Sequence, residues 1–128
     1  MPCTRFNPPN LHAPVGAYNH CNVVQPGSRL LVAAGQIGVK LDGTLIKDPH
    51  EQIAQTWRNV RTVVEAAGMT HRDIVKLTVY MVGSEHVEYS RECRNQTIEG
   101  ERPGSTLVYV AGLADPDMII EIDVIAAA

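Results

Sequence analysis

The sequence predicts one α+β domain, a mixed, mostly antiparallel sheet with two helices on one of its faces. The spacing of apolar residues alternates between the two-residue period of strands and the 3.6-residue period of helices. The predicted order is strand, strand, short hairpin, helix, strand, helix, strand, strand. Helices that lie between strands in this order are typical of an α+β domain. A length of 128 residues is enough for one core that buries about two thirds of the unfolded surface.

Composition excludes several classes of function. The net charge is -3 and lysine and arginine form no run, which argues against a nucleic-acid partner and favours a small molecule or a protein. The 3 cysteines have no C-x-x-C spacing, so we expect a reducing compartment and no zinc or redox motif. The first ten residues lack an apolar run, and no apolar stretch approaches membrane length. We therefore expect a cytoplasmic protein with no membrane segment.

The first third of the chain predicts two strands and a turn. Residues 1–14 are rich in proline and asparagine, which predicts an irregular surface arm. The stretches Ala17–Val24 and Arg29–Ala34 flank Gln25–Ser28, whose proline and glycine suit the two central positions of a turn, so we expect a β-hairpin. The second stretch is apolar from its second residue onward, as in a central strand covered on both faces. It ends at Gly35, which permits a bulge or the close approach of a ligand to backbone N–H groups.

A tight hairpin at Asp42-Gly43 precedes the clearest helix. Asp48 can cap this helix, with Pro49 in the first turn and Glu51 at the capping-box spacing. Its apolar stripe consists of Ile53, Trp57, Val60, Val64 and Ala67, and Gly68 suits its end. Trp57 is therefore expected in the core and not as a platform for a cofactor. Four polar residues lie mostly off the stripe and are expected on a solvated face: Gln55, Arg58, Asn59 and Arg61.

The second half of the chain predicts a strand, a helix and two further strands. The strand Ile74–Val82 alternates, with Val75, Leu77, Val79 and Met81 on its core face. Ser84 can cap a helix that runs to about Ile98, but its apolar positions make a poor stripe, so we expect an exposed, less firmly held helix. After the loop Glu99–Gly104, two apolar runs separated by Gly112–Asp117 form the C-terminal strands.

The last strand places two carboxylates side by side. Met118, Ile120, Ile122 and Val124 share one face, whereas Ile119, Glu121, Asp123 and Ile125 share the other. This second face is either solvated near one end of the sheet or turned toward a small wet pocket. Because two helices on one side cannot also bury this face, subunit association is the simplest cover, with polar pockets where the chains meet.

Six blocks of the sequence occur in the same order and with matching spacing in a known family. They are Gly16–His20, Ala34–Ile37, Glu65–Gly68, Asp73–Tyr80, Arg102–Ser105 and Ile120–Ala126. On these blocks the chain resembles the RidA (YjgF) family of reactive-intermediate deaminases. The resemblance implies a chorismate-mutase-like subunit in a homotrimer, with a central β-barrel and ligand pockets between subunits.

The resemblance also implies a set of site residues. They are Tyr18, the backbone at Ala34 and Gly35, position 105, Thr106 and Glu121. Deaminases of the family hydrolyse enamines and imines such as 2-aminoacrylate and its imine tautomer to ammonia and a 2-keto acid, without metal or organic cofactor. This chemistry needs a carboxylate that orients and partly deprotonates a water, which Glu121 can do. Tyr18 or a backbone carbonyl can serve the nitrogen.

The sequence departs from the family at position 105, where the deaminases carry an arginine that holds the substrate carboxylate. Ser105 stands there, Leu107 replaces a family cysteine, and we do not expect Arg102 to reach the pocket. Losing the charged pair weakens the binding of a small carboxylate by about 1.5–3 kcal/mol, roughly ten- to a hundredfold. The chain thus resembles the Arg-lacking branch. With Ser105 we expect a pocket that tolerates neutral or differently placed polar substrates, and a substrate other than 2-iminopropionate.

The remaining candidates are weaker. His20 shares an alternating face with Tyr18 and could shuttle a proton, although a surface or interface position accounts for it as well. No histidine pair has metal-ligand spacing, so we expect no metal. Three functions remain open: a hydrolase of a small imine, enamine or related C–N bond, a non-catalytic trimer that binds a metabolite or protein, and, least favoured, an endoribonuclease.

Overall fold

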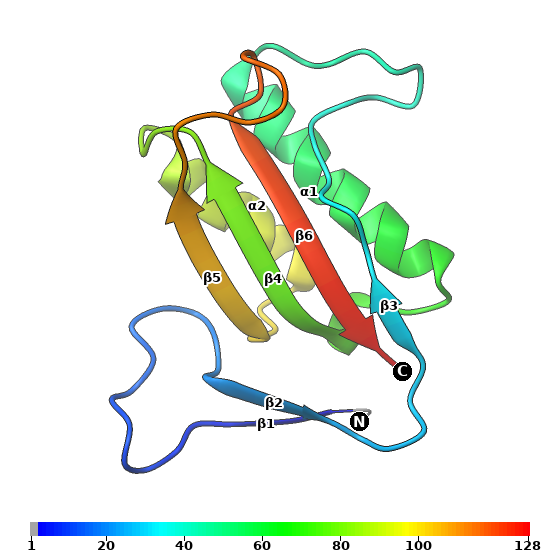
Figure 1. The fold of residues 1–128 in the computed structure, drawn as a ribbon, viewed down its shortest axis with the longest axis vertical. Coiled ribbons are helices and arrows are strands. Elements are labelled where there is room, and N and C mark those ends of the chain that lie inside the picture. Colours follow the sequence, from blue (N-terminus) through cyan, green and yellow to red (C-terminus); the bar gives the residue numbers. More distant parts are fainter. Residues whose placement is uncertain (1–2) are drawn as a thin grey trace.

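A four-stranded mixed sheet with two helices against one face forms the body of the molecule (Figure 1). The computed structural model describes residues 3–128. Its strands are β1 (Cys3–Phe6), β2 (Cys21–Val24), β3 (Leu30–Val32), β4 (Ile74–Met81), β5 (Gly104–Tyr109) and β6 (Ile120–Ala127). Its helices are α1 (Pro49–Ala66), α2 (Val87–Ile98) and the short 3-10 turn η1 (His71–Asp73). The predicted α+β class, with a mixed sheet and two helices, is confirmed.

The order of strands in the sheet is β3-β6-β4-β5, with β1 and β2 in a separate pair. The two C-terminal strands, β5 and β6, do not pair with each other, because β4 lies between them. β4 runs parallel to β5 and antiparallel to β6. Helix α2 makes the crossover that a parallel pair requires. β3 and β5 therefore form the two edges of the sheet (Figure 1).

The predicted hairpin between residues 17 and 34 is wrong, although its turn is present. Gly27 has a φ of 82°, and the N–H of Ser28 donates to the carbonyl of Gln25 at 3.3 Å. β2 pairs with β1, whereas β3 pairs with β6. The cause lies directly after the turn, where the backbone of Arg29 exchanges two hydrogen bonds with Ala128 and so leads the chain to β6.

The N-terminal arm and the second predicted strand also need correction. Residues 1–14 are not irregular throughout, because Cys3–Phe6 forms β1, which buries Cys3 beside Val75 and Ala127. β3 is an edge strand and not a central one. Leu30 and Val32 are 59% and 66% exposed. A run of apolar residues predicts burial on two faces, but one chain covers only the face that packs on the helices.

The start and stripe of α1 agree with the prediction. Asp48 caps the helix by accepting from the N–H of Glu51 at 3.0 Å, Pro49 is in the first turn, and Gly68 has a φ of 75°. The core beneath α1 contains Ile53, Trp57, Val60 and Val64 together with residues of β4 and β6. α2 begins at Val87, three residues after the predicted cap, and buries only Ser90, Cys93 and Ile98.

A bulge changes the face of one predicted core residue in β4. Ile74 pairs with Ala126 and Lys76 with Ile125, so Val75 is the extra residue between them. Val75 packs with Cys3 on the opposite side of the sheet from the other apolar residues of β4. Strict alternation could not predict this, because an inserted residue reverses the faces of its neighbours.

Polar side chains of α1 hold two loops against the helix. Gln52 is fully buried, donates to the carbonyls of Ile46 and Asp117 at 2.8 and 2.9 Å, and accepts from the N–H of Ile119 at 2.7 Å. Asn59, expected on a solvated face, donates to the carbonyls of Ile37 and Val39 at 2.8 and 2.9 Å. Loop carbonyls without a strand partner need such donors, and side chains of the helix supply them.

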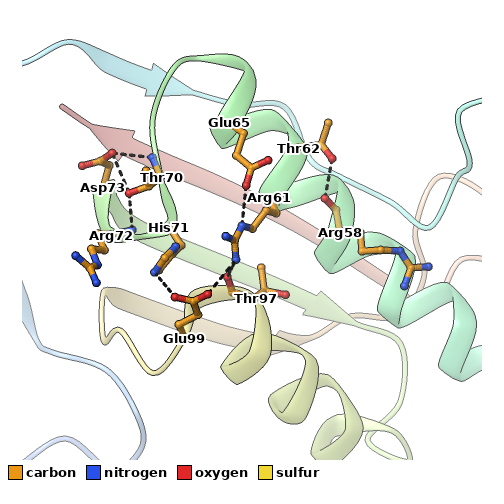
Figure 2. A network of polar contacts seen from close by, with 10 residues as sticks. All are labelled: Arg58, Arg61, Thr62, Glu65, Thr70, His71, Arg72, Asp73, Thr97 and Glu99. Atoms are coloured by element: carbon orange, nitrogen blue, oxygen red, sulfur yellow. Dashed lines mark hydrogen bonds and ion pairs between the residues drawn. The ribbon is translucent and has the colours of Figure 1, made fainter.

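A second network joins the C-terminal ends of α1 and α2 to η1 (Figure 2). Arg61, also expected in solvent, donates to the carbonyl of Thr97 at 2.9 Å and pairs with Glu65 at 2.9 Å. Glu99, which has a φ of 50°, lies 3.0 Å from His71 and 3.8 Å from Arg61. These contacts hold the chain where it leaves α2 and approaches β5.

Replacing Gln52 by leucine should lower the free energy of unfolding by about 2–4 kcal/mol, because three backbone groups lose their partners. Gln96→Leu is the matched control, since Gln96 is an exposed residue of α2 and should change stability little. Urea denaturation followed by circular dichroism measures both. Equal effects of the two variants would show that the Gln52 contacts do not stabilise the loops.

Candidate functional site

Strand β6 sets the position of the candidate carboxylate. Ile120, Ile122 and Val124 are fully buried beneath the helices, so Glu121 and Asp123 point to the other face of the sheet. Glu121 pairs across the ladder with Tyr80 of β4. This agrees with the predicted faces of the last strand.

The two carboxylates have different surroundings. The hydroxyl of Tyr80 donates to Oδ2 of Asp123 at 3.1 Å, and this bond, with the charges of Asp123 and Glu121, raises the pKa of Tyr80. Tyr80 therefore stays a donor to Oδ2 of Asp123. Within residues 3–128, Glu121 makes no hydrogen bond or ion pair. Of the two groups, only Glu121 keeps both of its oxygens available for a water or ligand.

Gly35 leaves the space that the Glu121 side chain occupies. A Cβ atom built on Gly35 would lie 1.9 Å from Oε2 of Glu121 and 2.7 Å from its Cδ. The chain on either side is attached to β6, because Ala33 donates to the carbonyl of Val124 and Gln36 exchanges two hydrogen bonds with Ile122. Between these bonds the first segment has two residues, Ala34 and Gly35, whereas β6 has one, Asp123. The extra residue makes a bulge at Ala34 and Gly35.

The other predicted site residues gather at the opposite edge of the sheet. A cavity of about 590 Å³ lies between the start of β5, α2 and the segment before β2, and a neighbouring one measures about 410 Å³. Tyr18, Ser105 and Thr106 line both cavities, and His20 lines the second. Tyr18 and His20 precede β2, which begins only at Cys21.

The contacts of these residues are specific. The hydroxyl of Tyr18 accepts from the N–H of Val15 at 3.3 Å, and its ring meets His20 edge-on at 5.5 Å between centroids. Nε2 of His20 lies 2.8 Å from the carbonyl of His12. Lys76 donates to the hydroxyl of Thr106. His20 and Thr106 therefore already have protein partners, whereas no side-chain bond holds Ser105 among the described residues.

One chain does not bring the two groups of predicted residues together. Ser105 pairs with Leu77 and so shares the helix side of the sheet, whereas Glu121 pairs with Tyr80 on the other side. Two strand spacings and three residues separate them, roughly 10 Å across and roughly 10 Å along the strands. Neither cavity is lined by Glu121, Ala34 or Gly35. In one chain the predicted site residues thus form two separate groups, one at Glu121 and one at Ser105.

Helix α2 adds two arginines that the apolar pattern does not single out. Arg91 and Arg94 line the larger cavity together with Ser90. The sequence holds one signal, since residues three apart lie on one face of a helix. Arg102 is not among the residues that line either cavity in the described chain.

Comparison with known proteins gives the family. The sequence model described as Endoribonuclease L-PSP matches residues 10–128. A RutC family protein of Pyrococcus horikoshii is 30% identical over 91% of this chain and 91% of its own. A crystal structure of a conserved Rid family protein of unknown function from Yersinia pestis is 28% identical, with a TM-score of 0.85 and 100% of both chains covered.

The chain therefore belongs to the RidA (YjgF) family. One further relative bears the name of an activity. The 2-iminobutanoate/2-iminopropanoate deaminase of Salmonella typhimurium is 38% identical over 56% of this chain and 55% of its own. Across the part of the chain that the structure describes, no helix is long and apolar enough to span a membrane.

Gly35→Ala should displace the Glu121 carboxylate while leaving the fold intact, because the new methyl group would occupy its place and Gly35 does not have a positive φ. Any activity or ligand binding that needs Glu121 should fall by about tenfold or more. Gly112→Ala is the control, since a Cβ there meets nothing within 4 Å. Thermal unfolding and ligand titration of both variants check this. An unchanged titration for Gly35→Ala would remove Gly35 from the site.

Proposed function

We propose that the protein is a homotrimeric hydrolase of small imines or enamines in which Glu121 positions the attacking water. The observation behind this proposal is the carboxylate of Glu121, which lies over Gly35 with no protein partner among the described residues. A carboxylate free to bind water is the group that hydrolysis of a C–N double bond needs. Asp123 is the weaker candidate, because its Oδ2 already accepts a hydrogen bond from Tyr80.

Assembly would complete the site. β6, which carries Glu121, and β5, which carries Ser105, are separated by β4 (Figure 1), so the two groups of residues would meet where Glu121 of one chain faces Ser105 of a neighbour. The face away from the helices also exposes apolar side chains, with Leu30 at 59%, Val32 at 66% and Val108 at 36%. Burying them between chains is favourable. Three chains arranged in this way would hold three equivalent pockets.

In such an assembly, Glu121 of one chain and Tyr18 of a neighbour can carry out the hydrolysis of an imine. Water held by Glu121 attacks the imine carbon while Glu121 takes one of its protons, and the electrons of the C=N bond move to nitrogen, which receives that proton from Glu121 to give a carbinolamine. Glu121 then takes the proton of the carbinolamine hydroxyl and delivers it to nitrogen as the C–N bond breaks, so that an imine and water give a ketone and ammonia. Tyr18 of the neighbour can bind the nitrogen. The named activity of the Salmonella relative supports this reaction class.

The competing functions have less support. A non-catalytic trimer would use the same pocket without needing an unpartnered carboxylate at Glu121. The family model and several relatives carry the word endoribonuclease in their names, but the net charge of -3 is unsuited to holding a polyanion. Ammonia release from freshly generated imines separates the hydrolase from both alternatives.

Glu121→Gln should reduce ammonia release by about 10²–10⁴-fold, because the amide cannot take a proton from water. Asp123→Asn, the matched change two residues away, should retain most of the activity. The measurement is ammonia release from imines and enamines generated in situ, with the assembly state of each variant checked by gel filtration. Greater damage from Asp123→Asn in an intact assembly would contradict the assignment of Glu121.

The purified protein should form a trimer, three times the 14.0 kDa of one chain. Val32→Asp should weaken this assembly, since it places a charge on the exposed apolar face. Multi-angle light scattering at micromolar concentration gives the mass directly. A stable monomer with full activity would exclude a site shared between chains.

A further inference from the structure

The larger cavity has a positive lining. Two arginines of α2, Arg91 and Arg94, line it, and the hydroxyls of Ser90, Ser105 and Thr106 add polar groups. The described residues around this cavity include no aspartate or glutamate. At about 590 Å³ it has room for a small molecule. A ligand there would meet guanidinium groups and neutral hydroxyl groups.

Of the two arginines, Arg94 is the one without an ion-pair partner among the described residues. It is half-buried, and among the described residues its guanidinium hydrogen-bonds only to the side-chain oxygen of the adjacent Asn95, at 3.3 and 3.4 Å. Within residues 3–128 no carboxylate lies within 4.0 Å of Arg94, whereas Arg91 pairs with Glu88. Burial and the nearby charges of Arg91 and Arg102 lower the pKa of Arg94. A partly desolvated cation without a counter-charge is stabilised when an anion binds beside it.

We infer that this cavity binds the anionic group of the substrate, a carboxylate, and that Arg94, with Arg91 beside it, is the residue that selects for it. The inference rests on the proposed function in taking this cavity as part of the substrate site. A guanidinium can donate two parallel hydrogen bonds to a carboxylate. Ser90 can add a third: its oxygen accepts from Nε1 of Trp57 at 3.2 Å, and its hydroxyl donates no hydrogen bond to another described residue.

This assignment reverses the preference expected from Ser105 alone. A serine at position 105 removes a cation from β5, which by itself favours neutral substrates. The structure places α2 against the same cavity, so the positive charge is supplied by arginines of the helix and not by a residue of the strand β5. The short side chain of Ser105 leaves space between the two. The inference therefore predicts a preference for anions, whereas Ser105 alone predicts tolerance of neutral or differently placed polar substrates.

The fluorescence of Trp57 can report ligand binding in this cavity. Trp57 is the only tryptophan in the sequence and lines the cavity. Pyruvate, the keto-acid product of such a reaction, and its neutral amide pyruvamide differ in the carboxylate alone. Binding of each is measured by Trp57 fluorescence and by calorimetry in the unmodified protein, in Arg94→Gln, and in Arg72→Gln as the control, since Arg72 is exposed on η1 away from the cavity.

We expect pyruvate to bind the unmodified protein at least about tenfold more tightly than pyruvamide. Arg94→Gln should weaken pyruvate binding by about ten- to a hundredfold and leave pyruvamide binding unchanged, whereas Arg72→Gln should change neither. Arg91→Gln should have a smaller effect in the same direction. Pyruvamide binding as tight as pyruvate binding, no binding of pyruvate, or Arg94→Gln matching the unmodified protein would each overturn the inference.

The test of the anion site and the test of the hydrolase function can succeed or fail independently. Binding that depends on Arg94 without any ammonia release would support the anion site and contradict the hydrolase. Ammonia release that depends on Glu121 but is indifferent to Arg94→Gln, for both anionic and neutral imines, would support the hydrolase and contradict the anion site. Thermal unfolding of Arg94→Gln confirms that the variant is folded before either comparison is made.

Discussion

The alternation of β6 is the constraint on which the candidate site depends. Ile120, Ile122 and Val124 are buried against α1 and β4, so a shift of this strand by one residue would move three large apolar side chains into solvent. Because that shift is costly, Glu121 is held on the opposite face of the sheet. The bulge at Gly35 then gives its carboxylate the space it needs. Core packing thus positions a polar group that takes no part in the core.

Two helices cover one face of the sheet and leave the other face partly open, and the predicted site residues lie in two separate groups on this sheet. The strand order β3-β6-β4-β5 places the Glu121 group near one edge and the Ser105 group at the other. β1 and β2 cover only one end of the open face, around Cys3, Val75 and Ala127. The rest exposes apolar residues of both edge strands. The proposed trimer would satisfy both the uncovered surface and the divided site.

Helix α2 has a modest structural role, which suits it to a role in binding. It buries only three residues, and its end is held by the network around Arg61 and Glu99 (Figure 2). The core therefore places few demands on its other positions. Arg91 and Arg94 occupy two of these and give the cavity its charge. The specificity we infer is set by residues on a side of the helix that stability leaves free.

The sequence by itself determined the features that depend on neighbours along the chain. Capping of α1 by Asp48, the turn at Gly27, the core stripe around Trp57 and the outward face of Glu121 all follow from local spacing. Only the tertiary structure decided which strands pair, because alternation specifies the faces of a strand and not its partner. Contacts between segments that are distant in the sequence also bury Gln52 and place the arginines of α2 at the same cavity as Ser105. A local sequence pattern carries no information about such contacts.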